Sequence, residues 1–97
     1  MVLAELAIFP TSEGTSVSQY VKEVIKEIEA SGLKSKTGGM STTIESPDIQ
    51  TLFKVIEKVH DILVKMDVKR IHIDLRVDHR LDKESSIDSK LQSIGKS

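Results

Sequence analysis

The chain contains no cysteine among its 97 residues. This absence excludes disulfide bonds, thiolate metal ligands and cysteine nucleophiles, and it is compatible with a reducing compartment. Residues 2–9 are apolar apart from Glu5, but no basic leader precedes them and they are too short to span a bilayer. We therefore expect a cytoplasmic protein without a membrane partner.

Aromatic residues are scarce, since only Phe9, Tyr20 and Phe53 occur and tryptophan is absent. A small domain with so little aromatic area gains limited stabilisation from its own core, which favours burial of further surface in a homo-oligomer. The net charge is −1, so no global field attracts nucleic acid. RNA-binding modules of this size stack bases on exposed aromatic rings, and Phe9 is the one candidate here. We expect no nucleic-acid partner.

Alternation of apolar and polar residues predicts strands at residues 2–9 and 71–77. Between them, a polar run at 34–38, a turn near Met40 and Ser41, and the β-branched run at 42–45 are typical of a hairpin. The sequence thus predicts four strands.

Apolar residues at steps of three and four predict two long amphipathic helices. The first opens with a capping-box pattern, Ser16 and Gln19, and ends at Gly32. The second opens with Ser46 as its N-cap and Pro47 as its first residue, and it extends to residues 66–67.

A short third helix is predicted near the C-terminus, and its apolar residues are Ile87, Leu91 and Ile94. Three apolar residues are too few for such a helix to fold alone. We expect it to dock on its own sheet or on a neighbouring subunit.

The order β-α-β-β-α-β predicts a single α+β domain, residues 1–97, with a ferredoxin-like sandwich. Right-handed crossovers place both long helices on one face of an antiparallel four-stranded sheet. We call the opposite face of the sheet the open face. The first and last strands should be neighbours, which brings Glu5 and Phe9 beside His72, Asp74 and Arg76 on this face.

Three interpretations of the open face remain. It is a solvated surface with cross-strand ion pairs, a sheet-to-sheet contact between subunits, or a ligand pocket within such a contact. Carboxylates and an aromatic ring would suit a flat cationic heterocycle in that pocket.

Catalytic and metal-binding patterns are weak. The serines occupy no elbow motif and the histidines have no recognisable partner spacing, so we expect no catalytic residues and no enzyme activity. A divalent-metal site formed by His72, Asp74, His79 and Asp82 is an alternative based on donor chemistry. We expect no resident cofactor.

Four collinear stretches resemble a known family. They are residues 5–10 with 14–18 close behind, 20–21, 40–45 and 70–80. In order and spacing they resemble the small thiamine-binding proteins of the YkoF-like ferredoxin-fold group. The resemblance implies βαββαβ subunits that pair through their sheets into homodimers or homotetramers and bind a thiamine-like ligand without chemistry.

On this resemblance, thiamine or its hydroxymethylpyrimidine part is the expected ligand. A carboxylate would pair with its cation or amino group, an aromatic ring would stack on it, and the residues of the 42–45 strand would bind its edges. The expected ligand-binding residues are Glu5, Phe9, Thr42, Thr43, Glu45, His72 and Asp74. The alternatives are a structural or regulatory oligomer without a small ligand, and the metal binder.

Overall fold

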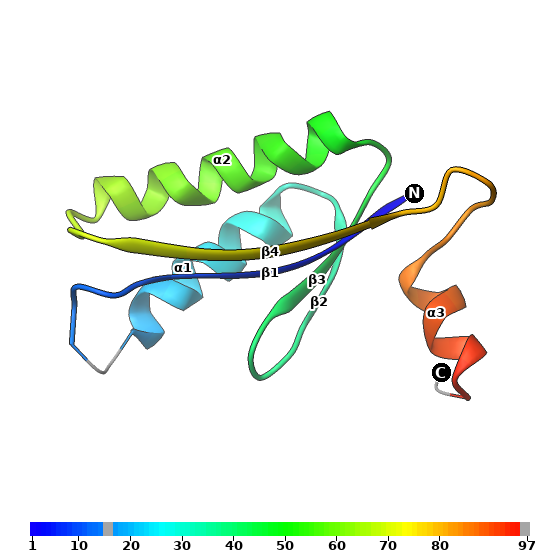
Figure 1. Cartoon of the computed structure of the whole chain (residues 1–97). Coiled ribbons are helices and arrows are strands. Elements are labelled where there is room, and N and C mark those ends of the chain that lie inside the picture. The colour runs from blue at the N-terminus through cyan, green and yellow to red at the C-terminus, as the bar shows by residue number, and fades with distance from the viewer. Residues whose placement is uncertain (15–16, 96–97) are drawn as a thin grey trace.

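The computed structural model describes residues 1–14 and 17–95. Its elements in chain order are β1 (Val2–Pro10), α1 (Ser18–Ala30), β2 (Lys34–Thr37), β3 (Thr42–Ser46), α2 (Ile49–Lys65), β4 (Ile71–His79) and α3 (Ile87–Ser93). The two long helices pack against each other, and α3 stands apart from them near the C-terminus (Figure 1). No helix within the described ranges has the length and apolar character needed to cross a membrane.

The four strands form one sheet in the order β2-β3-β1-β4, and every neighbouring pair is antiparallel. This order follows from two crossovers that each skip one strand, β1-α1-β2 and β3-α2-β4. The predicted ferredoxin-like α+β fold is confirmed.

The core lies between the sheet and the two long helices. Every second residue of β1 faces the helices and is buried, as the alternation of its sequence predicts. Each long helix contributes one apolar stripe at helical spacing. The buried core residues include Val2, Ala4, Leu6, Ile8, Tyr20, Val24, Ile28, Ile44, Leu52, Val59 and Leu63.

The C-terminal end of α1 matches the prediction, whereas the start of α2 does not. Gly32 follows α1 with a φ of 82°, a left-handed conformation that favours glycine. Ser46 is the last residue of β3, where it pairs with Val2, so it cannot cap α2. Asp48 is the cap instead, and its carboxylate accepts the Thr51 N–H at 2.7 Å. The predicted capping residue of α1, Ser16, lies outside the described residues.

The hairpin between β2 and β3 closes in a tight turn. The N–H of Gly38 donates to the carbonyl of Ser41 at 2.8 Å, and Met40 at the tip is almost fully exposed. A Cβ atom at Gly38 would lie 3.2 Å from that same oxygen, so glycine suits the close approach of the two chains. This turn sets the register of β2 beside β3.

Candidate functional site

The strand registers place one residue from each strand in a line across the open face. Arg76 of β4 lies opposite Glu5 of β1, which lies opposite Thr43 of β3, which lies opposite Lys36 of β2. Directly opposed residues in antiparallel strands point to the same face of the sheet. Glu5 therefore occupies the middle of the open face, with a basic residue near each edge.

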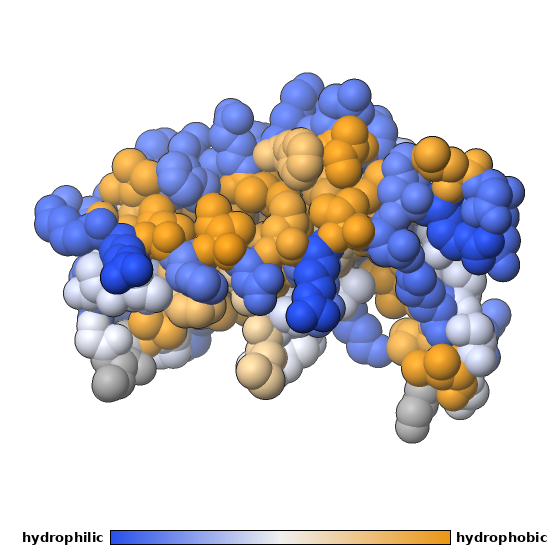
Figure 2. All heavy atoms as spheres, viewed as in Figure 1, coloured by the Kyte–Doolittle hydropathy of each residue, from blue (hydrophilic) through white to orange (hydrophobic). Residues whose placement is uncertain are grey.

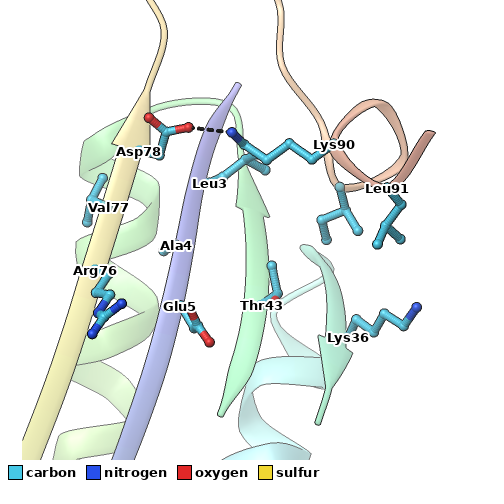
Figure 3. Close-up of a pocket in the computed structure, with 11 residues that line it drawn as sticks. Leu3, Ala4, Glu5, Lys36, Thr43, Arg76, Val77, Asp78, Lys90 and Leu91 are labelled. Carbon is cyan, nitrogen blue, oxygen red and sulfur yellow. Dashed lines mark ion pairs between the residues drawn. The ribbon is translucent and has the colours of Figure 1, made fainter. Parts of the chain in front are cut away.

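One end of this face is covered by α3. The backbone N–H of Ile87 donates to the buried carboxylate of Glu45 at 3.3 Å. Two ion pairs hold the helix across the sheet, with Lys90 Nζ 2.7 Å from Asp78 and Lys34 Nζ 2.6 Å from Asp88 (Figure 3 shows the first). The C-terminal helix thus docks on its own sheet, one of the two outcomes that the sequence left open.

These ion pairs shift the pKa values of their members. The hydrogen bond from Lys90 lowers the pKa of Asp78, and the hydrogen bond to Asp88 raises the pKa of Lys34. Both shifts favour the charged forms, so both contacts are complete at neutral pH.

A cavity of about 510 Å³ lies between α3 and the open face. This volume is within the range of small-molecule sites. Figure 3 shows Glu5 and Thr43 on the strands, Leu91 on α3, and Arg76 and Lys36 on the two edge strands. The lining residues include Leu3, Glu5, Thr43, Lys36, Arg76, Ile87 and Leu91.

A second hollow of about 270 Å³ adjoins the first and shares Glu5 and Arg76 with it. Asp74 and Ser41 also line it, and the hydroxyl of Ser41 donates to Glu5 Oε1 at 2.7 Å. This hydrogen bond fixes the carboxylate where the two hollows meet. Glu5 can therefore face a ligand in either hollow.

Phe9 and His72 form a separate group at the far end of the open face. Their ring centroids are 5.1 Å apart with planes tilted by 36°, a separation within the range of aromatic contacts. They line neither the 510 Å³ cavity nor the 270 Å³ hollow.

The structure brings together only part of the predicted site. Glu5 and Thr43 line the main cavity and Asp74 lines the hollow beside it, whereas Glu45 is engaged by α3. Thr42 lies opposite the core residue Leu6, so it faces the helices and is buried. Consecutive strand residues point to opposite faces of the sheet. The sequence alone therefore indicates that Thr42 and Thr43 cannot both lie on the open face.

Nine of the eleven residues that line the main cavity were absent from the predicted set, and three of them show why: Leu3, Lys36 and Leu91. Leu3 lies two residues before Glu5 in the same strand, so the sequence alone predicts that both side chains point to the same face of the sheet. The other two required knowledge of the hairpin register and of where α3 docks, and no local pattern provides these.

The four residues proposed as metal ligands do not form one site. His72 and Asp74 lie on the open face, whereas His79 lies opposite Val2 on the helix-facing side. Asp82 accepts a hydrogen bond from Arg80 Nε at 2.9 Å. Among residues 1–14 and 17–95, no three histidine or acidic side chains are grouped in a way that could hold a metal ion.

The chain matches the family model described as "Thiamine-binding protein" over residues 4–95. A UPF0045 protein of Methanocaldococcus jannaschii is 38% identical over 97% of this chain and 92% of its own length. The crystal structure of that protein aligns with a TM-score of 0.90 and covers 99% of this chain and 97% of its own.

Two further relatives agree. A UPF0045 protein of Bacillus subtilis is 35% identical over 99% of this chain and 96% of its own length. A Thermotoga maritima protein, named as a candidate thiamine biosynthesis/salvage protein, aligns with a TM-score of 0.82 at 19% identity and covers 96% of this chain and 97% of its own. This last similarity shows the fold alone. By sequence and by fold, the chain belongs to the thiamine-binding protein family.

Proposed function

We propose that this chain is a non-catalytic binding protein for thiamine or its hydroxymethylpyrimidine part, with the ligand on the open face beside Glu5. The observation that carries the proposal is the cavity of about 510 Å³, which has an acidic residue on its floor. Membership of the thiamine-binding protein family supports the choice of ligand. The proposal includes a cytoplasmic location, which the cysteine-free composition supports.

The lining of the cavity suits the two rings of thiamine. The carboxylate of Glu5 pairs with the thiazolium cation or accepts from the amino group of the pyrimidine. Leu3 and Leu91 offer apolar surface to a ring face, and the Thr43 hydroxyl can bond a ring nitrogen. Asp74 supplies a second carboxylate in the neighbouring hollow.

The proposal also includes a sheet-to-sheet contact between subunits. The hollows beside Glu5 lie on a sheet face that α3 covers at one end only. A second sheet packed on this face would exclude water from the ligand and strengthen its pairing with the carboxylate. The assembly would be a homodimer or a homotetramer.

Calorimetric titration tests the proposal. Thiamine and hydroxymethylpyrimidine are titrated separately into the wild type, Glu5→Gln and Glu29→Gln, a control on the exposed side of α1. Loss of one charged hydrogen bond costs about 1.5–3 kcal/mol, so we expect Glu5→Gln to weaken binding by roughly 10- to 100-fold. The control should bind like the wild type. Absence of heat with both compounds in the wild type contradicts the proposal.

The non-catalytic part has its own test. Thiamine incubated with the wild-type protein should give an unchanged proton NMR spectrum after separation from the protein. A new product that requires the protein would show that the site performs chemistry.

A further inference from the structure

The two hollows on the open face differ in charge, although they share Glu5 and Arg76. Apart from the ion pair that joins α3 to β4, the charged residues that line the 510 Å³ cavity are Glu5, Lys36 and Arg76, which leaves an excess of positive charge. The charged residues of the 270 Å³ hollow are Glu5, Asp74 and Arg76, which leaves an excess of negative charge. A ligand that carries only a cation complements the smaller hollow and leaves the positive charge of the larger cavity unmatched.

Arg76 is the cation common to both hollows, and no protein group pairs with it. It lies directly opposite Glu5 in the β1–β4 ladder, a position that favours a cross-strand ion pair. The Glu5 carboxylate instead accepts a hydrogen bond at 2.7 Å from Ser41, the residue before β3. Figure 3 shows the Glu5 carboxylate turned toward β3. Within the described part of the chain Arg76 forms no ion pair, so its guanidinium is available to a ligand.

Charges of opposite sign follow one another along β4 beside the hollows. Asp74 and Arg76 lie opposite Ala7 and Glu5, on the same face of the strand and about 7 Å apart along it. Figure 2 shows hydrophilic side chains along β4 on the side away from α2, next to the apolar band of the core. The open face therefore presents two carboxylates and one guanidinium within reach of a single small ligand.

We propose that the site beside Glu5 takes the phosphate ester of a cationic heterocycle, with the ring between Glu5 and Asp74 and the phosphate on Arg76. This inference rests on the proposed function, because it places the same ring system in the same site. The planar guanidinium suits a phosphate group, which it binds through two parallel hydrogen bonds. In thiamine the hydroxyethyl arm of the cationic ring is the point of esterification. Its two carbons and the ester oxygen span a length similar to the spacing of Asp74 and Arg76.

Lys36 adds a second positive charge to the larger cavity. It belongs to β2, at the opposite edge of the sheet from Arg76, and Figure 3 shows its ammonium group at the rim below Leu91. In the same described ranges Lys36 forms no ion pair. An exposed charge at this distance attracts an anion but does not orient it, so Lys36 contributes less than Arg76 to binding of the phosphate.

Met40 gives the smaller hollow an apolar wall. This residue at the tip of the hairpin is 93% exposed, and it lines the hollow together with Ala7. A thioether makes favourable contacts with an aromatic ring. A ring that lies between the two carboxylates would cover both of these apolar side chains.

Calorimetric titration of the wild type compares thiamine, its phosphate monoester and inorganic phosphate. The ester should bind about tenfold or more tightly than thiamine, because it adds a charged pair of hydrogen bonds. Inorganic phosphate lacks the cationic ring and should bind much more weakly than the ester. An ester that binds no more tightly than thiamine, or inorganic phosphate that binds as tightly as the ester, overturns the inference and leaves the proposed function standing.

The same titrations separate the two proposals in the remaining cases. Binding of the ester without binding of thiamine or hydroxymethylpyrimidine contradicts the proposed function and supports the phosphate site. Absence of binding for every compound overturns both.

Arg76→Gln gives the sharper test, because it should act in opposite directions on two ligands. It removes the partner of the phosphate, so the affinity for the ester should fall by roughly 10- to 100-fold. It also removes a like charge beside the cationic ring, so thiamine itself should bind more tightly, by up to about fivefold. Lys58→Gln removes the same charge from the exposed side of α2 and is the matched control, which should bind both ligands like the wild type.

Two further variants complete the series. Arg76→Lys keeps the charge but lacks the planar fork, so it should recover part of the affinity for the ester. Lys36→Gln should weaken the ester by no more than about fivefold. If Arg76→Gln weakens thiamine and the ester alike, the role of Arg76 is structural and the inference is overturned. An advantage of the ester over thiamine that survives in Arg76→Gln overturns it as well.

Discussion

At the scale of single residues, Glu45 shows how a polar side chain on a sheet can fix the position of a helix. Its carboxylate is buried and accepts the first N–H of α3 at 3.3 Å. Backbone N–H groups at the start of a helix lack partners within that helix, so an acceptor placed there fixes where the helix begins. The side chain predicted to bind the edge of a ligand thus anchors α3, which forms one wall of the cavity.

Substitution of Glu45 should loosen α3 while leaving the sheet intact. Glu45→Ala removes the acceptor of the Ile87 N–H, and we expect the free energy of α3 docking to fall by about 1–2 kcal/mol. Glu45→Gln keeps an acceptor oxygen and is the matched control. Native-state hydrogen exchange should show faster exchange of α3 amides in the alanine variant only. Unchanged protection of α3 in Glu45→Ala would show that the other contacts of the helix, its two ion pairs and the buried Ile87, are enough to hold it.

The residue scale also shows what a sequence can and cannot tell about the site. The alternation of residues in β1 and β4 shows which side chains share a face of the sheet. Glu5, Asp74 and Arg76 were therefore correctly predicted to lie together on the open face. Thr42 faces the helices and Thr43 the open face, as the alternation of consecutive strand residues requires, whereas the position of Lys36 beside Thr43 depends on the register that the turn at Gly38 sets.

At the scale of elements, the fold was predictable because every core element carries its own periodic pattern. Alternation in β1 and β4 and the apolar stripes of α1 and α2 fix which faces are buried, and the order of elements then restricts the topology. The placement of α3 was not predictable, because it depends on long-range pairs such as Lys90 with Asp78. No periodicity encodes such pairs.

The docking of α3 should depend on pH through Asp78. The hydrogen bond from Lys90 lowers the folded-state pKa of Asp78 below its ordinary value of 3.8. A carboxyl group whose pKa is lowered in the folded protein stabilises the folded state at any pH above its ordinary pKa. This stabilisation is lost as the pH falls through the lowered pKa. We therefore expect α3 to undock in this acidic range, as measured by a fluorophore attached at Gln92→Cys. In Asp78→Asn the contact with Lys90 no longer titrates, so a transition of unchanged size would assign the effect to another carboxylate.

At the scale of the whole molecule, the shape favours assembly. The radius of gyration is 14.1 Å, and the molecule measures 41 × 27 × 20 Å. A compact domain of this length would have a radius of roughly 12.5 Å. The excess reflects the two nine-residue strands, β1 and β4, and a C-terminal helix that stands off the main body (Figure 1). Such a chain keeps much of its apolar surface near solvent unless a second copy covers it.

Association should make thermal stability depend on protein concentration. For a dimer of two 97-residue chains, a tenfold rise in concentration should raise the melting temperature by about 3–4 °C. Scanning calorimetry of the wild type over a hundredfold range of concentration measures this dependence, and a constant melting temperature would argue against sheet-to-sheet association of the subunits.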